Sequence, residues 1–300
     1  MENEISGRGR CVNNYPPCKT RISVALVTRN RPDSLLRTLR SLVQQDVQPS
    51  EVIVSDDSDE GVADEVRSIV EEYGFQYLRG PRRGLYANRN HVALACTGTH
   101  IRTMDDDHEF PAGHFQVCEE ALQKDPAAVW IISEFLPTEK PGVTLCPGQL
   151  HPRGFSTEPT DPNDCWAISD GASLYPITIF QRGIRYAEYF KFGAAYLEFG
   201  SRLRWLGYQI RFLPSTYVIH HYDPNARSYM NREIDASSRF FASLCHSFIY
   251  QPKVRNKVLC CLEITRQVIL ANAYASLYSA ILAYRHHGTI VRTQCLQKRF

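Results

Sequence analysis

The sequence predicts an α/β fold built on a doubly wound sheet, with a helical extension at its C-terminal end. Short apolar runs alternate with segments of helical periodicity from residue 22 onward, acidic clusters follow two of these runs, and residues 229–284 have mostly helical spacing. With 43% hydrophobic and 11% aromatic residues among 300, the chain can fill one large or two ordinary cores. Disordered and fibrous classes are therefore excluded.

The first part of the chain alternates strand and helix. Residues 22–27 (ISVALV) form a continuous apolar run, which is typical of a strand buried on both faces. Leucines at helical spacing follow in residues 33–43. The same pattern then gives a strand at 52–54, a helix at 62–70 and a short strand at 75–78. This order of elements is the start of a doubly wound sheet.

The second part continues the pattern less regularly. A loop at 80–84, a helix at 87–95 and a strand at 101–104 are followed by residues 129–176, which are rich in prolines. We expect that stretch to be a loop-rich surface that covers a substrate rather than part of the core. Later segments predict a helix and two strands, at 197–206, 209–213 and 217–219.

These elements suggest three parts of the chain, namely an N-terminal extension (1–21), one α/β domain (22–222) and a helical C-terminal extension (223–300). The formal charge is +2, which is too balanced for a dedicated nucleic-acid binder and makes a small-molecule substrate the better expectation. The first ten residues contain acids and no apolar core, unlike a signal peptide, so the sequence predicts a cytoplasmic protein.

Acidic clusters follow two of the predicted strands, at residues 56–57 and 105–107. Because ligands of open α/β sheets bind at the carboxyl ends of the strands, both clusters should face one crevice. Residues 28–32 (TRNRP) contain no glycine, which excludes a dinucleotide fingerprint. Carboxylates bind phosphates only through a cation, and Asp105 and Asp107 share one side of a strand, so one divalent ion could bridge them to a diphosphate. An acidic turn remains the alternative.

Four segments, taken in this order and spacing, resemble the family 2 glycosyltransferases. They are TRNRPDSLLRTLRSLVQQ, VIVSDDSD, GLYANRNHVALACTGTHIRTMDDDHE and EFGSRLRWLGYQI. The resemblance covers roughly residues 22–222. It implies the GT-A fold, a Rossmann-like mixed sheet, and transfer of a sugar with inversion from a nucleotide-diphosphate sugar, UDP-linked by family frequency.

The resemblance also implies roles for individual residues. A Mn²⁺ or Mg²⁺ ion would be held by Asp105, Asp107 and His220 and would stabilise the leaving diphosphate. The nucleotide sugar would be bound by Thr28 and Asn30 at the base and ribose, by Asp56 at the base, by Asp57 near the ribose, and by Gly84, Arg89 and Asp106 around them. Helix capping by Asp56 and Asp57, a structural ion pair of Arg89 and a surface histidine pair at His220 and His221 remain open alternatives.

The catalytic base is the point at which the sequence departs from the family. Inverting transfer needs a carboxylate that takes the proton of the acceptor hydroxyl. The position that commonly holds this acid is Tyr196, a poor base near neutral pH. Our first candidate is therefore Glu198, whose alternative role is an ion pair with Arg202 one helical turn away. Asp170 is the second candidate, and impaired catalysis is the third outcome.

The tail contains an uncharged stretch of about 18 residues, 267–284, with cationic residues on both sides. Its length is that of a membrane span, but its polar residues favour an amphipathic helix that packs on the domain or lies on an anionic membrane surface. By analogy with related enzymes, the acceptor is a hydroxyl of a glycan, a lipid-linked molecule or a small molecule.

Two other functions fit the same residues. A catalytically silent homologue would bind a nucleotide sugar or a protein partner without transfer, and Tyr196 is the main support for it. A nucleotidyltransferase would also use paired carboxylates and a metal, but it needs a glycine-rich basic loop near the first strand, which is absent from residues 28–32.

Overall fold

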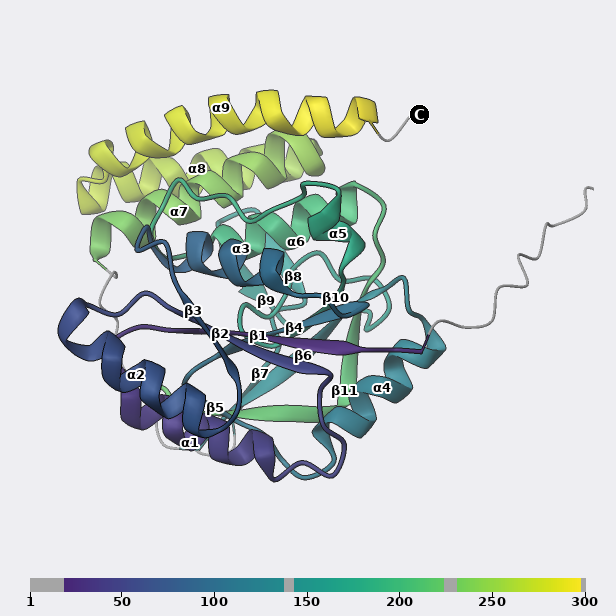
Figure 1. The fold of residues 1–300 in the computed structure, drawn as a ribbon. Coiled ribbons are helices and arrows are strands. Elements are labelled where there is room, and N and C mark those ends of the chain that lie inside the picture. The colour runs from purple at the N-terminus through teal and green to yellow at the C-terminus, as the bar shows by residue number, and fades with distance from the viewer. Residues whose placement is uncertain (1–18, 138–142, 224–230, 298–300) are drawn as a thin grey trace, which may run out of the picture.

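A computed structural model describes residues 19–137, 143–223 and 231–297 (Figure 1). The predicted extension at residues 1–21 therefore lies almost entirely outside the described residues. The strands are β1 Ile22–Thr28, β2 Glu51–Asp56, β3 Gln76–Arg79, β4 His100–Asp105, β5 His108–Glu109, β6 Val129–Leu136, β7 Val143–Leu145, β8 Gln149–His151, β9 Phe155–Thr157, β10 Ser173–Pro176 and β11 Ile210–His220. The helices are α1 Pro32–Val43, α2 Glu60–Glu72, α3 Leu85–Ala95, α4 His114–Lys124, α5 Thr178–Gln181, α6 Ala195–Trp205, α7 Arg232–Cys245, the π-helical turn His246–Tyr250, α8 Val254–Ala271 and α9 Tyr274–Gln297.

The main sheet is mixed and runs in the order β3-β2-β1-β4-β10-β6-β11-β5, with β7 paired to β6. Strands β3, β2, β1 and β4 are parallel, so the polar residues after β1, β2 and β4 lie at one edge. Val27 is the register partner of Asp105 on β4, and Thr28 is the register partner of Asp56 on β2. This α/β fold with a mixed sheet confirms the fold predicted from the sequence.

Helices cover both faces of the sheet. Apolar residues of α1, α2 and α4 pack on one face, and those of α3, α5 and α6 pack on the other. Beyond α6, helices α7, α8 and α9 form a further layer at the top of Figure 1. Strands β1 and β2 are buried on both faces, which explains why they appear in the sequence as apolar runs.

The expectation of a loop-rich surface at residues 129–176 was wrong for its two ends. β6 and β10 are buried strands in the middle of the sheet. Tertiary pairing of these short segments overrides a local composition rich in loop formers. Between them, β7, β8, β9 and their loops do lie over the carboxyl edge of the sheet and contribute residues 145–147 and 154–158 to the wall of a cavity.

The uncharged stretch 267–284 is not one helix. Asn272, with a φ of +52°, ends α8, and α9 begins two residues later. Among the described residues, no helix has the length and apolar character that crossing a bilayer requires.

Gly84, at the start of α3, packs closely against the loop that precedes α6. It precedes α3 with a φ of +112°, and a Cβ atom there would lie 2.6 Å from the Cα of Lys191. The amide of Leu85 donates a hydrogen bond to the carbonyl of Lys191 (2.8 Å). The close approach of two backbones therefore requires glycine at this position.

We expect Gly84→Ala to lower the free energy of unfolding by about 1–3 kcal/mol, because alanine adds backbone strain and a contact with Lys191. Gly61→Ala is the matched control, since Gly61 lies in α2 with open space around it. The control should be neutral or stabilising by up to about 1 kcal/mol. Urea unfolding measures both, and equal effects would contradict the assignment.

Candidate active site

A cavity of about 890 Å³ opens at the carboxyl ends of β1, β4, β6 and β11. Its floor contains the acids that follow the strands, and its wall contains residues from the β7–β9 segment and from α6 and α7. Of the residues predicted for the site, those lining this cavity are Thr28, Asp57, Asp105, Asp107, Asp170 and His220. The fold thus brings together residues up to 192 positions apart.

Arg89 organises one side of the floor. Its guanidinium is almost fully buried, and Nη2 donates to both oxygens of Asp105 (2.8 and 3.0 Å). Its Nε lies 2.9 Å from Oδ1 of Asp170. Burial raises the pKa of Asp170 to about 7, although the charge of Arg89 opposes that rise. Arg89 is therefore the structural ion-pair partner of two cavity acids and does not itself line the cavity.

Arg31 is the ion-pair partner of the acids on the other side of the floor, and no pattern in the sequence predicted this role. Its Nη1 donates to Oδ2 of Asp107 (2.8 Å) and its Nε donates to Asp106 (3.2 Å). Asp106 also accepts a hydrogen bond from Oγ1 of Thr28 (2.7 Å). Asp106 is fully buried, and burial raises its pKa. It therefore holds Arg31 and Thr28, which both line the cavity, in place from below.

The acids and histidines beside Arg31 form a cluster. Ligand atoms of Asp107, His108 and His220 all lie within 4.8 Å of one another. The Nε2 of His220 is 3.6 Å from Asp107, and its Nδ1 is 2.8 Å from Oε2 of Glu134. Although burial opposes it, these two carboxylates raise the pKa of His220 to about 10. Burial would raise the pKa of Asp107, but the bond to His220 and the charge of Arg31 lower it.

The donor atoms of this cluster fit a divalent cation. Oδ1 of Asp107 and both ring nitrogens of His108 are buried without a hydrogen-bond partner among the described residues. Buried polar atoms without a hydrogen-bond partner are costly unless a ligand engages them. A carboxylate with two imidazoles suits a divalent transition metal such as Mn²⁺. Asp105, which was predicted as a ligand, has both oxygens engaged by Arg89, whereas His108 was missed.

Strand pairing in the sheet is what brings His108 to His220. His108 in β5 is the register partner of His220 in β11, and the two rings are 4.9 Å apart between centroids. In the sequence, His108 follows the acidic triplet directly, but 112 residues separate it from His220. A two-residue strand such as β5 gives no recognisable periodicity, so this pairing could not be predicted.

The predicted nucleotide residues fall into two groups. Thr28 and Asp57 line the cavity, and Oδ2 of Asp57 is buried without a hydrogen-bond partner among the described residues. Asn30 and Asp56 do not line it. Asn30 exchanges two hydrogen bonds with Asp59 (2.8 Å each), and Asp56 accepts hydrogen bonds from the hydroxyl of Tyr77 (3.0 Å) and the amide of Ser58 (2.8 Å). These two residues therefore fix the loops after β1 and β2.

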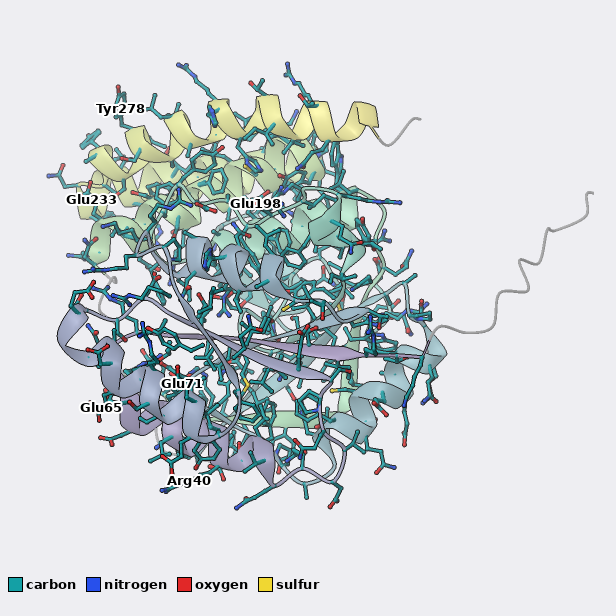
Figure 2. All side chains as sticks on the ribbon, viewed as in Figure 1. Arg40, Glu65, Glu71, Glu198, Glu233 and Tyr278 are labelled. Carbon is teal, nitrogen blue, oxygen red and sulfur yellow. The ribbon has the colours of Figure 1, made fainter. Side chains whose placement is uncertain are left out.

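Glu198, our first candidate for the base, lies away from the cavity. It is fully buried in α6, where it accepts hydrogen bonds from Nε of Arg202 (3.0 Å) and the hydroxyl of Tyr250 and pairs with Nε2 of His287 (2.9 Å). Burial would raise its pKa, but Arg202 and His287 lower it to about 2. Glu198, labelled in Figure 2, thus connects α6 to the C-terminal helices and does not line the cavity. Tyr196 does line the cavity, but burial raises its pKa further.

The fold resembles solved structures of GT-A glycosyltransferases at low sequence identity. GalNAc-T7, crystallised with UDP, GalNAc and Mn²⁺, superposes with a TM-score of 0.62 at 16% identity over 76% of this chain, which spans about half (48%) of that protein. S. aureus TarS 1-349 with UDP has a TM-score of 0.61 at 13% identity, covering 93% of this chain and 88% of that one. The mannosyltransferase PcManGT from Pyrobaculum calidifontis, with GDP-Man and Mn²⁺, has a TM-score of 0.55 at 17% identity, covering 91% and 76%.

The mixed sheet and the acidic cavity at its carboxyl edge define a protein of this glycosyltransferase class. Residues 23–182 match the family model described as glycosyl transferase family 2, and the chain belongs to that family. No curated protein matches the chain by sequence. The family predicted from four sequence segments is thereby confirmed.

We expect Glu198→Gln to lower the free energy of unfolding at pH 7 by about 3–5 kcal/mol, because it leaves the buried charge of Arg202 uncompensated. Glu198 has a lowered pKa, so its contribution is complete above the ordinary value of 4.5 and is lost as the pH falls toward about 2. The difference between native chain and variant should therefore shrink between pH 5 and pH 2, as measured by denaturant unfolding.

Asp235→Asn is the matched control, since Asp235 and Arg239 form an exposed pair with the same spacing as Glu198 and Arg202 (3.0 Å). It should change stability by no more than about 0.5 kcal/mol. A variant of Glu198 that is as stable as this control would contradict the structural role.

Proposed function

We propose that this protein transfers a sugar, with inversion, from a UDP-linked donor to a hydroxyl acceptor in the cavity at the carboxyl edge of the sheet. The observation that carries the proposal is the cluster of Asp107, His108 and His220 beside Thr28 and Asp57. These residues supply a cation site, of which Asp107 and His220 line the cavity and His108 is buried behind them, next to polar groups that suit a nucleotide. UDP is favoured because GalNAc-T7 and TarS were both crystallised with it, whereas PcManGT was crystallised with GDP-Man.

Asp107, His108 and His220 would hold Mn²⁺ or Mg²⁺ against the diphosphate. A bound divalent ion there neutralises the charge that develops on the leaving diphosphate. Thr28 and Asp57 contact the nucleoside, while Arg31 and Arg89 keep the acids in place from below. Arg31 also offsets the charge of Asp106 and Asp107, so that several carboxylates can share one floor.

Asp170 is the base that we propose for the transfer. In the reaction, an acceptor oxygen attacks the anomeric carbon, the bond from that carbon to the diphosphate oxygen breaks, and the hydroxyl proton passes to Asp170. A base needs a pKa near the working pH, and the pKa of Asp170, raised to about 7, meets that condition. Its side chain is 20% exposed on the cavity wall, in contrast to that of Glu198.

The acceptor enters from the side formed by the β7–β9 segment. Leu145 and Phe155 are exposed apolar side chains of the cavity wall, and the ring of Phe155 stacks on His151 at 4.5 Å. An aromatic face with nearby polar groups suits the packing of a sugar ring. The acceptor proposed is a hydroxyl of a glycan, a lipid-linked molecule or a small molecule.

We expect Asp107→Asn to abolish the Mn²⁺-dependent part of the thermal stabilisation by UDP. The amide keeps the shape of the side chain but removes the anionic ligand. Thermal denaturation with UDP, GDP or dTDP, with Mn²⁺ or with EDTA, measures this effect. Asp46→Asn changes an exposed residue in the loop before β2 and should retain the Mn²⁺-dependent stabilisation. No response of the native chain to any nucleotide would overturn the proposed donor.

We expect Asp170→Asn to lower turnover by about 10²–10⁴-fold while the melting shift with UDP and Mn²⁺ is retained. Because ionised Asp170 is the active form, turnover of the native chain should rise with pH through about 7, and the variant should lose this dependence. Glu198→Gln serves as the comparison and should retain turnover per folded molecule. Retained turnover in Asp170→Asn would exclude Asp170 as the base.

A further inference from the structure

Helix α8 is covered by the rest of the protein along only one narrow face. Of its 18 residues, only Asn256 and Cys260 are buried. On the opposite side, an apolar stripe comprises Val254, Val258, Leu262 and Ile269, which are 78%, 50%, 58% and 69% exposed. At 100° per residue these four positions fall within 80° of one another, so they share one side of the helix, with Thr265 in the turn between Leu262 and Ile269. The stripe is too long and too apolar to be a scatter of single exposed residues.

Cationic side chains flank this stripe. By the same helical geometry, Arg255 and Arg266 lie on one edge and Lys257 on the other. Residues 251–297 contain a single acid, Glu263, whose carboxylate is held by Arg266 and Gln267. An apolar stripe with cations on both edges and no unpaired acid has the pattern of a helix that lies in the plane of an anionic membrane.

Helix α9 also exposes a line of apolar and aromatic side chains beside a cation. Tyr274, Tyr278 and Leu282, one helical turn apart, are 61%, 67% and 48% exposed, and Arg285 continues that line. Figure 2 shows Tyr278 at the outer surface of the helical layer, far from Arg40 and Glu65 on the opposite side of the molecule. Tyrosine, with an apolar ring and a polar tip, is enriched at the level of lipid headgroups.

We propose that the α8–α9 layer docks on an anionic membrane surface, with the stripe of α8 entering the headgroup region. Charge complementarity favours an anionic membrane, rather than a second copy of the chain, as the partner of this surface. Pairing two copies through the stripe would bring the cations of one α8 against those of the other, and Glu263, the single acid of that helix, is already paired with Arg266. The proposal does not depend on the donor or on the reaction, because none of the stripe residues lines the cavity.

The test is flotation of the full chain with vesicles, without nucleotide or metal. The chain should bind vesicles of phosphatidylcholine with 30% phosphatidylglycerol and not vesicles of phosphatidylcholine alone, and binding should weaken as salt is raised. The variants Arg255→Glu with Lys257→Glu, and Leu262→Ser with Ile269→Ser, should each reduce partitioning by about tenfold or more. Val43→Ser with Leu94→Ser, two exposed aliphatic residues on other helices, is the matched control and should bind as the native chain does.

All variants are first compared by melting temperature and by circular dichroism, so that a loss of binding is not a loss of folding. Equal binding to neutral and anionic vesicles, no binding to either, or equal loss in the control pair would each overturn the proposal. So would a dimer in light scattering that Leu262→Ser with Ile269→Ser dissociates, because a second copy would then be the occupant. Failure of vesicle binding with a normal response to UDP would leave the proposed function intact.

Discussion

The cavity depends on the neutralisation of several carboxylates that the sheet brings to one edge. Parallel pairing of β2 and β4 with β1 places the terminal acids of β2 and β4 at one edge, and in a partly buried site like charges oppose one another strongly. Two arginines from neighbouring elements resolve this conflict. Arg89 of α3 binds Asp105 and Asp170, while Arg31, at the start of α1, binds Asp106 and Asp107. With these pairs formed, the remaining donor atoms can face the cavity.

A second buried network, around Glu198, has a different function. Its carboxylate joins α6 to the π-helical turn through Tyr250 and to α9 through His287. With Arg202 as a third partner, these residues enclose the carboxylate, and Glu198 does not line the cavity. The contrast with Asp170 is physical: Glu198 is fully buried and strong pairing lowers its pKa, whereas Asp170 is 20% exposed on the cavity wall and desolvation raises its pKa. The C-terminal helices are thereby tied to the domain that holds the cavity.

Local patterns predicted much of the fold and part of the site. Apolar runs and helical spacing gave β1, α1, β2 and α2 because buried parallel strands and amphipathic helices leave those periodicities in the chain. The acids after β2 and β4 could be assigned to one edge from the parallel order alone. The same reasoning failed for β6 and β10, which lie in proline-rich surroundings and owe their place to antiparallel and parallel partners far away in the sequence.

The sequence by itself determined the family, the position of the acidic edge and the absence of a glycine-rich nucleotide loop, since these follow from contiguous residues. Only the tertiary structure decided which side chains face the cavity. Glu198 lies two positions after Tyr196 and Asp170 lies in an earlier loop, and spacing along the chain cannot tell a carboxylate enclosed by Arg202 from one exposed on a wall. His108 joined the site for the same reason, because the pairing of β5 with β11 is a long-range contact that leaves no local trace in the sequence.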